Sequence, residues 1–475
     1  MSIKFNADDT IAAISTPLGE SGIGIVRLSG KDALRIADKI FLSKTKSSLT
    51  GAAAFTTHYG FVTEFVKTSS GHKYARKRKI VDEVIVNIMR APRSYTREDI
   101  AEINCHGGII PLKRTLDLLL KHGARLAQPG EFTQRAVLNG RIDLTQAEAI
   151  FNIINAKTLL AQDGAMNQLR GALSRRIKQI KDALVDIIAP LEASIDFPDD
   201  EINISQRKRR IRLLMRTAKE VKDLMDTADR GIMLQQGINV ILAGSTNVGK
   251  SSLMNRLVEF ERVIVTPIAG TTRDIVEEVI NINGLPAKIA DTAGIIDTKC
   301  LITKQSVNRS LEFLKQADLA LFILDGSRKL NRFDLALADK LKDKKVIVVV
   351  NKIDLPQKIN VGILKKILPT AAKVEISALK GAGVGKLKDK IVKMFFHGDI
   401  LKNDEILIAS LRHKQALNSC QGALSRAISL EKEKGFSECV IFELRCATQC
   451  LADMVGEDLS EDILTNIFSR FCIGK

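Results

Sequence analysis

The segment that most constrains this chain is Gly244–Ser251, which reads Gly-Ser-Thr-Asn-Val-Gly-Lys-Ser. An apolar run, Ile238–Ala243, precedes it, and apolar residues at helical spacing follow it. A glycine-rich loop between a strand and a helix curls around phosphate groups, because its backbone N–H groups and the helix N-terminus face the anion. Lys250 adds a positive charge, and Ser251 offers a hydroxyl ligand to Mg²⁺. The segment predicts an α/β domain that binds a nucleotide.

Four further segments follow in the order expected of a guanine-nucleotide site. Thr266–Asp274 contains the hydroxyls of a switch segment, and Asp291–Gly294 follows a short apolar strand. Asn351–Asp354 reads Asn-Lys-Ile-Asp after a buried apolar run, and Ser377–Leu379 follows another. The carboxylate of Asp354 can accept two N–H bonds from guanine, and adenine would leave it unpaired, so ATP would be rejected. Together the five segments predict a GTPase.

The predicted GTP-binding residues are members of these five segments. They are Asn247, Val248, Gly249, Lys250, Ser251, Ser252, Thr266, Pro267, Ile268, Ala269, Gly270, Thr271, Thr272, Asp291, Thr292, Ala293, Gly294, Asn351, Lys352, Ile353, Asp354, Ser377, Ala378 and Leu379. Within this set, Ser251 and Thr272 are the predicted Mg²⁺ ligands.

Length and composition limit the class of protein. With 475 residues the chain exceeds a single hydrophobic core, so several domains are expected. No signal-like or membrane-spanning run stands out, which favours a cytoplasmic protein without a membrane partner. Seven scattered cysteines fit reduced thiols. The formal charge of +17 favours a polyanionic partner, for which we expect RNA rather than DNA. The basic runs 73–79 and 207–212 are expected to be solvated faces, with RNA contact as the alternative.

The residue pattern, and with it the predicted secondary structure, changes along the chain. Residues 1–140 mix strand-like and glycine-bearing segments, which indicates an α+β domain. Residues 141–235 carry apolar residues at helical spacing, punctuated by Pro190 and Pro198. The GTPase segment spans 236–395, and residues 396–475 are helical again. We expect a Ras-like domain, with a mixed sheet and helices on both faces, inserted into one all-helical domain; two separate helical pieces are the alternative.

The whole chain resembles the bacterial and organellar tRNA-modification GTPase family MnmE, also called TrmE. The resemblance rests on motifs outside the GTPase segments. These are Thr10-Ile-Ala-Ala with Gly24-Ile-Val-Arg27, Ser94-Tyr-Thr-Arg-Glu-Asp99, Glu102-Ile-Asn-Cys-His-Gly-Gly108, Pro129-Gly-Glu-Phe-Thr-Gln-Arg135, the stretch 138–149, Ile195-Asp-Phe-Pro-Asp199 and the terminal Phe471-Cys-Ile-Gly-Lys475.

The resemblance implies a folate-binding N-terminal domain, residues 1–140, that forms a homodimer. It also implies a heterotetramer with the flavoprotein MnmG, so FAD would enter only through that partner. Such complexes place an aminomethyl or carboxymethylaminomethyl group on carbon 5 of the wobble uridine (U34) of certain tRNAs. The one-carbon unit comes from 5,10-methylenetetrahydrofolate, with 5-formyltetrahydrofolate as a second folate that could bind.

The resemblance also assigns residues to these roles. Arg27, Glu102, Arg141 and Lys475 would contact folate, and the family often has lysine in place of Arg141. Cys472 matches the functional cysteine of the family and is a predicted catalytic residue. From the residues alone, a buried small hydrophobe would be the better interpretation of that cysteine. His106 and His413 are expected to be structural or, at most, to face RNA.

Hydrolysis needs a charge-neutralising group, and the position after Asp291–Gly294 holds Ile295, which cannot polarise water. In the family, K⁺ fills this role, bound here by Asn247, Thr266, Ile268 and Thr271. Thr272 and Thr303 complete the predicted catalytic residues.

Two residues depart from the family pattern, and two other functions are compatible with parts of the sequence. Thr303 stands where the family has a glutamate that positions water, so hydrolysis is expected to be slow unless Asp297 or another residue substitutes. Arg97 stands where the family usually has glycine, which predicts an altered turn near the folate pocket.

A ribosome-assembly GTPase that acts as an RNA-binding timer would share the GTPase segments and the positive charge, but not the N-terminal domain or the terminal Cys-Ile-Gly-Lys. A chain that binds tRNA and MnmG but hydrolyses GTP poorly is a third reading.

Overall fold

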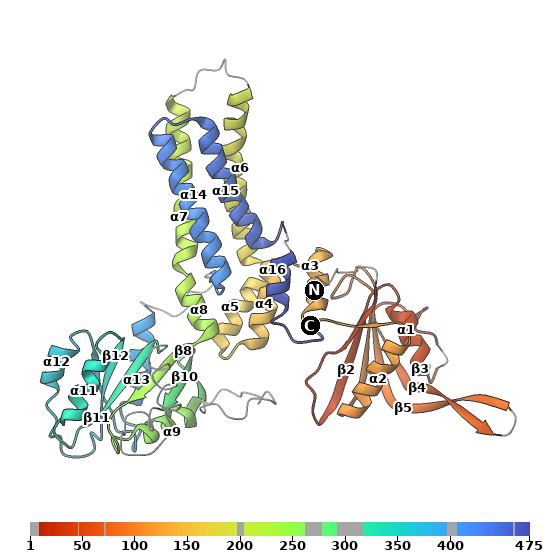
Figure 1. Ribbon diagram of the computed structural model, residues 1–475, viewed down its shortest axis with the longest axis horizontal. Coiled ribbons are helices and arrows are strands. Elements are labelled where there is room, and N and C mark those ends of the chain that lie inside the picture. Colours follow the sequence, from red (N-terminus) through yellow and green to blue (C-terminus); the bar gives the residue numbers. More distant parts are fainter. Residues whose placement is uncertain are drawn as a thin grey trace. The chain divides into compact units, whose positions relative to one another are not determined.

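The computed structural model describes residues 9–45, 47–70, 73–196, 204–261, 278–291, 317–396, 406–458 and 461–475. The chain divides into two compact units (Figure 1). The first unit combines Met1–Phe151 with the chain end, Val455–Lys475, and the second is Asn152–Met454. Among the described residues, no helix is both long enough and apolar enough to cross a membrane.

The first unit is built on a seven-stranded sheet in the order β3-β4-β5-β6-β2-β1-β7. Its strands are β1 (Ile11–Ile14), β2 (Ser21–Ser29), β3 (Phe41–Ser43), β4 (Thr56–Ser70), β5 (Lys73–Met89), β6 (Ile100–Gly107) and β7 (Arg125–Leu126). All neighbouring pairs are antiparallel except β1 and β7. β4 and β5 extend as a two-stranded arm beyond their pairing with β6 (Figure 1).

Helices α1 (Ala33–Ile40) and α2 (Ile109–Lys121) cover one face of this sheet, where they share a core with alternate strand residues. On part of the opposite face, Phe132 packs on Ile11 and Ala13. A separate apolar cluster joins α3 (Glu131–Leu138), the start of α4 (Leu144–Asn155), and α16 (Glu461–Phe468). Phe468 and Phe471 in that cluster dock the end of the chain onto the N-terminal part of the sequence.

The second unit contains a bundle of long helices, α6 (Ala172–Asp196), α7 (Ile204–Asp226), α14 (Leu411–Lys432) and α15 (Ser437–Val455), with the shorter α5 (Leu159–Leu169) and α8 (Ala228–Gln236) (Figure 1). The apolar stripe predicted on α6 is buried, including Ile177, Ile180 and Leu184. Pro190 does not interrupt this helix, contrary to the expectation that it would punctuate it. It lies on the exposed side of α6, and Pro198 is outside the described residues.

The same unit carries a six-stranded sheet in the order β13-β12-β11-β8-β10-β9. Its strands are β8 (Ile238–Ala243), β9 (Glu278–Ile282), β10 (Leu285–Asp291), β11 (Leu319–Asp325), β12 (Val346–Asn351) and β13 (Ala372–Glu375). Only the β9–β10 pair is antiparallel. The central strands are continuous apolar runs because both faces of a parallel sheet are covered.

Helices flank this sheet on both sides. One face packs against α9 (Lys250–Glu261) and α13 (Val384–Phe395), and the other packs against α11 (Arg332–Lys340) and the short α12 (Leu364–Ile367), which follows a 3₁₀ turn at Val361–Ile363. In chain order this α/β part lies between α8 and α14. The structure confirms the predicted fold class, a P-loop domain with a mixed sheet interrupting a helical domain and preceded by an α+β domain.

Candidate functional site

The loop between β8 and α9 has the geometry of a phosphate loop. Gly249 has a φ of +97°, and a Cβ there would lie 2.3 Å from Asn351 Nδ2. At Gly244 a Cβ would lie 2.4 Å from the carbonyl oxygen of Ile323. Both positions therefore require glycine. Lys250 is buried, and its Nζ donates to the carbonyl oxygens of Gly244 and Ser245, each at 2.9 Å. The ammonium group is thus held by the loop that would surround a phosphate.

Asn351 joins the phosphate loop to the predicted base-binding segment. Its Nδ2 donates to the carbonyl oxygen of Val248 at 2.8 Å, and its Oδ1 accepts from the backbone N–H of Ala378 at 2.9 Å. The side chain is 2% exposed, so both hydrogen bonds are shielded from water. The Arg256 guanidinium of α9 also donates to the carbonyl oxygens of Ala378 and Leu379. These contacts bring three segments of the sequence to one edge of the sheet.

Asp354 lies at this edge as an exposed carboxylate. A hydrogen bond from the side chain of Ser377, together with backbone hydrogen bonding and nearby lysines, lowers the pKa of Asp354. Ser377 itself is buried and is fixed by a hydrogen bond from its N–H to the carbonyl oxygen of Ala382. The carboxylate is therefore ionised at neutral pH and oriented by a buried partner, as a guanine acceptor requires.

Lys352 connects the base-binding segment to the phosphate loop. Its Nζ lies 2.6 Å from Asp325 Oδ2 and donates to the carbonyl oxygen of Asn247 at 2.9 Å. Lys352 and Asn247 have φ values of +66° and +60°, in the left-handed region that non-glycine residues seldom adopt. Burial raises the pKa of Asp325, but hydrogen bonds from Lys352 and Ser327 outweigh it and hold that pKa below its ordinary value.

The remaining nucleotide-site residues divide into those that the structure places and those outside the described residues. Ser251 and Ser252 are exposed in the first turn of α9, Ile353 is half-buried, and Leu379 is exposed. Asp291 ends β10, beside Leu242 of β8. Outside the described residues are the switch positions Thr266, Pro267, Ile268, Ala269, Gly270, Thr271, Thr272, Thr292, Ala293, Gly294 and Thr303, with Ile295 and Asp297.

The four predicted folate residues lie together in the first unit. Arg27 of β2 is opposite Glu102 of β6 in the antiparallel register, and its guanidinium donates to Glu102 Oε1 at 2.8 Å. The same guanidinium lies 5.7 Å from the ring centre of Tyr95, and that of Arg141 lies 4.7 Å from it. The backbone of Lys475 reaches the same place, where its carbonyl oxygen accepts from the N–H of Phe132 at 3.2 Å. Two cations therefore lie close to one aromatic ring, an arrangement that suits an anionic ligand with a ring system.

The chain end is fixed here by backbone contacts. The N–H of Gly130 donates to the carbonyl oxygen of Cys472, and Pro129 forms a β-bridge with Ile473. Arg27 donates to the carbonyl oxygen of Gly474 at 3.3 Å. Gly474 has a φ of +97°, and a Cβ there would lie 2.4 Å from the carbonyl oxygen of Ile14. This tail presents Cys472 as an exposed thiol at a defined position.

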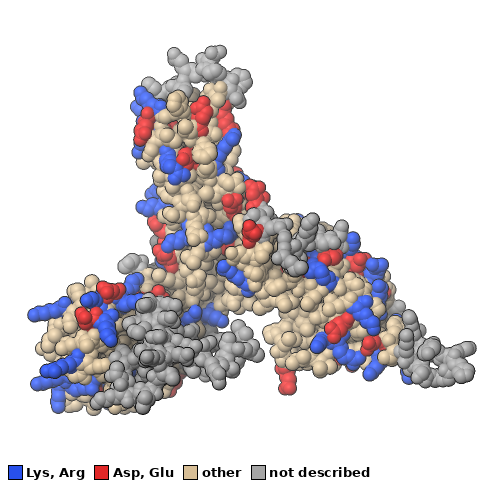
Figure 2. Space-filling view, in the orientation of Figure 1, with Lys and Arg blue, Asp and Glu red and all other residues tan. Residues whose placement is uncertain are grey.

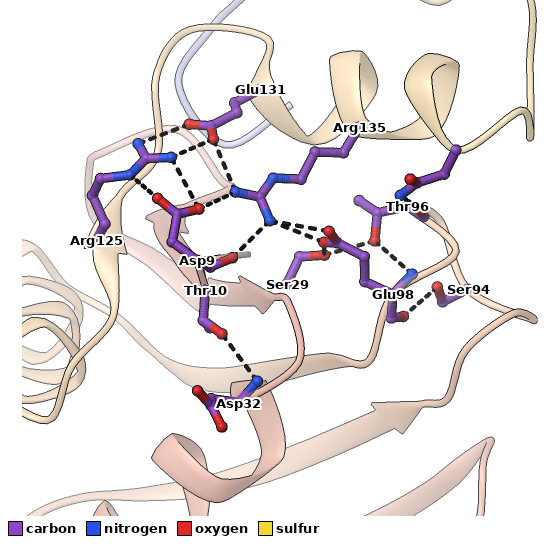
Figure 3. A network of polar contacts seen from close by, with 11 residues as sticks. Asp9, Thr10, Ser29, Asp32, Ser94, Thr96, Glu98, Arg125, Glu131 and Arg135 are labelled. Atoms are coloured by element: carbon purple, nitrogen blue, oxygen red, sulfur yellow. Dashed lines mark hydrogen bonds and ion pairs between the residues drawn. The ribbon is translucent and has the colours of Figure 1, made fainter. Parts of the chain in front are cut away.

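A network of charges around the buried Arg135 supports the segment that holds the tail (Figure 3). Arg135 is 1% exposed and binds Asp9, Glu98 and Glu131, at 2.5, 3.1 and 3.1 Å. Arg125 binds Asp9 and Glu131 from the other side, each at 2.6 Å. Burial raises the pKa of Asp9, but the two arginines outweigh it and lower that pKa. The network joins the start of β1, the loop before β6, and α3.

Sequence reasoning assigned no role to Tyr95 or Arg135. Tyr95 is half-buried, its hydroxyl contacts Thr133 Oγ1 at 2.8 Å, and burial raises the pKa of its phenol. Tyr95 and Arg135 lie in motifs that carried the resemblance, yet their roles depend on packing. Arg97 has a φ of +62° and donates to the carbonyl oxygen of Asn139 at 2.8 Å. That left-handed backbone explains the glycine expected at this position.

The two histidines that were expected to be structural differ in setting. His413 is fully buried in α14, and its Nε2 lies 2.9 Å from the Arg412 guanidinium. His106 is exposed, but its Nδ1 lies 2.6 Å from the buried carboxylate of Asp82. The hydrogen bond and charge of Asp82 raise the pKa of His106.

Comparison with known proteins gives consistent matches along the chain. A family model described as the MnmE helical domain matches residues 144–472, and one described as the GTP-binding protein TrmE N-terminus matches residues 10–141. A tRNA modification GTPase MnmE of Thermoanaerobacter pseudethanolicus is 45% identical over 469 residues, which cover 98% of this chain and 99% of the relative. One of Clostridioides difficile is 43% identical with the same coverage. One of Alkaliphilus metalliredigens is 41% identical over 468 residues, again 98% and 99%.

Proposed function

Since this chain belongs to the MnmE family of tRNA modification GTPases, we propose that it is a K⁺-dependent GTPase acting on the wobble uridine of certain tRNAs. With an FAD-containing MnmG partner, it would add an aminomethyl or carboxymethylaminomethyl group to carbon 5 of U34. The one-carbon unit would come from 5,10-methylenetetrahydrofolate. The observation that carries the proposal is that Arg27, paired with Glu102, and Arg141 both lie over Tyr95, while the Lys475 tail binds the backbone of Phe132 beside Arg27. The same chain also has the geometry of a guanine-nucleotide site.

For the nucleotide, the described residues fit the proposed roles. Lys250 and the loop N–H groups would bind the phosphates, Ser251 would hold Mg²⁺, and Asp354 would accept from guanine. Asn247 is exposed with its backbone fixed by Lys352, so its amide oxygen is available as a K⁺ ligand. Thr266, Ile268 and Thr271 would supply the other K⁺ ligands. A cation there offsets the negative charge that develops during phosphoryl transfer.

For folate, the donor set fits a ligand with an aromatic ring system and carboxylates. The guanidinium groups of Arg27 and Arg141 would meet carboxylates, and the Tyr95 ring offers a flat apolar surface. Glu102, which is 18% exposed, would fix Arg27 and accept a ligand N–H. Cys472 would act next to this site as the functional thiol. We further propose a homodimer formed through the N-terminal unit, a cytoplasmic location and a heterotetramer with MnmG.

The decisive experiment is nucleoside analysis of tRNA from cells that lack this protein. We expect the modified wobble uridine to disappear, to return with the wild-type chain, and to stay absent with Arg27→Met, which retains GTP hydrolysis. Arg35→Met is the matched control, because Arg35 is 65% exposed and pairs with Asp32 on the surface of α1. Unchanged wobble uridines in the deletion strain would reject the proposal. Absence of tetrahydrofolate binding at millimolar concentration would reject its folate part.

The rate of hydrolysis is a separate part of the proposal. Because Thr303 stands where the family has glutamate, we expect slow turnover unless Asp297 or another residue orients the water. K⁺-stimulated turnover of the wild type and of Thr303→Glu would be compared. A wild type that is already fast, with no gain in Thr303→Glu, contradicts this expectation.

A further inference from the structure

Helix α7 begins with a cluster of cations. Lysine and arginine are the only charged residues in its first part, and the first acidic residue of the helix is Glu220. Such a run has two possible explanations, internal pairing or an outward-facing binding surface, and the structure separates them residue by residue.

Two of the cations are used inside the bundle. Glu431 of α14 is 2% exposed, and its carboxylate binds Arg207 at 3.1 Å and Arg210 at 2.8 Å. Arg207 also donates to the backbone carbonyl oxygen of Glu431 at 2.7 Å. A buried carboxylate needs such partners to remain ionised. These two arginines therefore stabilise the bundle and are not available to an external partner.

The other cations face solvent. We call them the α7 stripe, defined as Lys208, Arg209, Arg212, Arg216 and Lys219, all of them exposed. At 100° and 1.5 Å per residue, they fall within an arc of about 100° and a length of about 16 Å. Among the described residues, Arg216 alone of the five has an acidic partner, Glu220 at 3.3 Å, and it is 79% exposed. The stripe is therefore a row of solvated charges that burial in the bundle does not require.

The packing of the bundle excludes insertion of α7 into a lipid surface. An amphipathic helix binds a membrane by inserting its apolar face. The apolar face of α7, with Leu214, Val221 and Leu224, is buried in this unit, where α7 lies beside α14 and α6 (Figure 1). Figure 2 shows both charge signs on the visible face of the bundle, so that face is not uniformly basic. A partner that matches one row of cations is itself a row of anions, as an RNA strand is.

We propose that the α7 stripe binds the phosphate backbone of tRNA. This inference rests on the proposed function, which supplies tRNA as the substrate, and it names the surface that holds it. The contacts are with phosphates and carry no base specificity, so the stripe contributes affinity and orientation while selection of the uridine occurs elsewhere.

The test is tRNA binding by a triple variant, Lys208→Gln, Arg212→Gln and Lys219→Gln, in the full chain. Glutamine retains helix propensity and leaves the pairs with Glu431 intact. The matched control is Lys340→Gln, Lys365→Gln and Lys366→Gln, which removes the same charge from exposed positions on α11 and α12. Filter binding of deacylated bulk tRNA would be measured across a salt series, with circular dichroism and GTP turnover as checks on folding.

We expect the α7 variant to bind tRNA at least tenfold more weakly than the wild type at moderate salt, with GTP turnover unchanged. Each lost phosphate contact lowers the slope of log affinity against log salt by about 0.7–0.9, so the slope should fall by about 2 to 3. The control should keep the wild-type slope. An α7 variant that binds as the wild type does would overturn the inference, as would an equal loss in the control, since bulk charge would then explain binding.

Failure of the inference and failure of the proposed function give different results. If deletion cells lose the wobble modification but the α7 variant binds tRNA normally, the inference that the α7 stripe binds tRNA is wrong and the proposed function stands. If the α7 variant loses tRNA binding but deletion cells keep every wobble nucleoside, the stripe is an RNA surface and the proposed function is wrong.

Discussion

The ion pair between Asp325 and Lys352 leads to a sharp prediction about nucleotide affinity. Asp325 Oδ2 binds Lys352 Nζ, while Oδ1 accepts from the N–H and hydroxyl of Ser327 at 2.9 and 2.6 Å. Lys352 then donates to the carbonyl oxygen of Asn247. Asp325→Asn keeps the shape and the acceptor for Ser327, but it removes the charge that holds Lys352 in place. The substitution therefore tests whether this pair prepares the loop for the nucleotide.

The expected loss of binding free energy follows from the exposure of the Asp325 and Lys352 side chains. A hydrogen bond to a charged group contributes about 1.5–3 kcal/mol when shielded from water. The side chain of Asp325 is 9% exposed, but that of Lys352 is 32% exposed, so solvent screening reduces the figure to about 1 kcal/mol. If the whole 1 kcal/mol stabilises the nucleotide-bound state, the Asp325→Asn variant binds GDP and GTP about fivefold more weakly. Because Lys352 and Ser327 hold the pKa of Asp325 below its ordinary value, the loss should be the same throughout the neutral pH range.

Displacement of a fluorescent GDP analogue, followed by stopped flow, gives both association and dissociation rates. We expect the loss mainly in dissociation, because the pair organises a loop that closes on the ligand. Asp343→Asn is the matched control, since Asp343 is an exposed aspartate of the same α/β part. Unchanged affinity in Asp325→Asn, or an equal change in the control, would refute the reasoning. A loss confined to acidic pH would also refute it.

Three further predictions concern the first unit. At pH values below 6.5, His106→Gln should have a lower denaturation midpoint than the wild type, and the two midpoints should converge as the pH rises. Asp82 raises the pKa of His106, so the stabilisation from the charged pair is lost above that pKa. A difference that persists at alkaline pH contradicts this. The free energy of unfolding of Arg97→Gly should be about 1 kcal/mol higher than that of Arg97→Ala. Both variants lose the side-chain hydrogen bond, and only glycine relieves the strain of the left-handed backbone. Equal denaturation midpoints for the two variants would disprove it. Gly474→Ala should weaken tetrahydrofolate binding at least tenfold in calorimetry with GTP turnover unchanged, because its Cβ meets a β1 carbonyl oxygen; Gly19→Ala, with open space around its Cβ, is the control and should bind normally.

The fold class was predictable because its signals are local. The run Ile238–Ala243 is apolar except for the half-buried Asn239, and it is a strand whose other residues are buried, as a parallel sheet requires. Gly249 marks a turn that no side chain fits, so the loop position could be read from one residue. The apolar spacing in 177–188 predicted a helix, which is α6, although Pro190 was misread as a break. An exposed proline is tolerated in a long helix whose other turns are well packed, and composition alone does not show that packing.

The less predictable features join residues that are distant in the sequence. Lys352 and Asp325 are paired across neighbouring strand ends, and nothing in either segment announces the other. Arg135 likewise meets Asp9, a partner that only the assembled sheet brings near. The positive φ of Arg97 is invisible in the residue itself, and the glycine that the family usually has at that position was the only signal of it. For such features the sequence names candidates, and packing decides their partners.

The positions of the basic residues in the run 207–212 show why net charge predicts binding partners poorly. Arg207 and Arg210 neutralise Glu431, which lies far along the chain, while Lys208, Arg209 and Arg212 face water. Helical spacing alone separates the two groups into different faces, but it cannot say which face meets a buried acid. The charge of +17 therefore includes cations already committed to the fold. The salt dependence of tRNA binding should follow the stripe and be insensitive to equal charge removed elsewhere, which is why the control variant carries as much weight as the test variant.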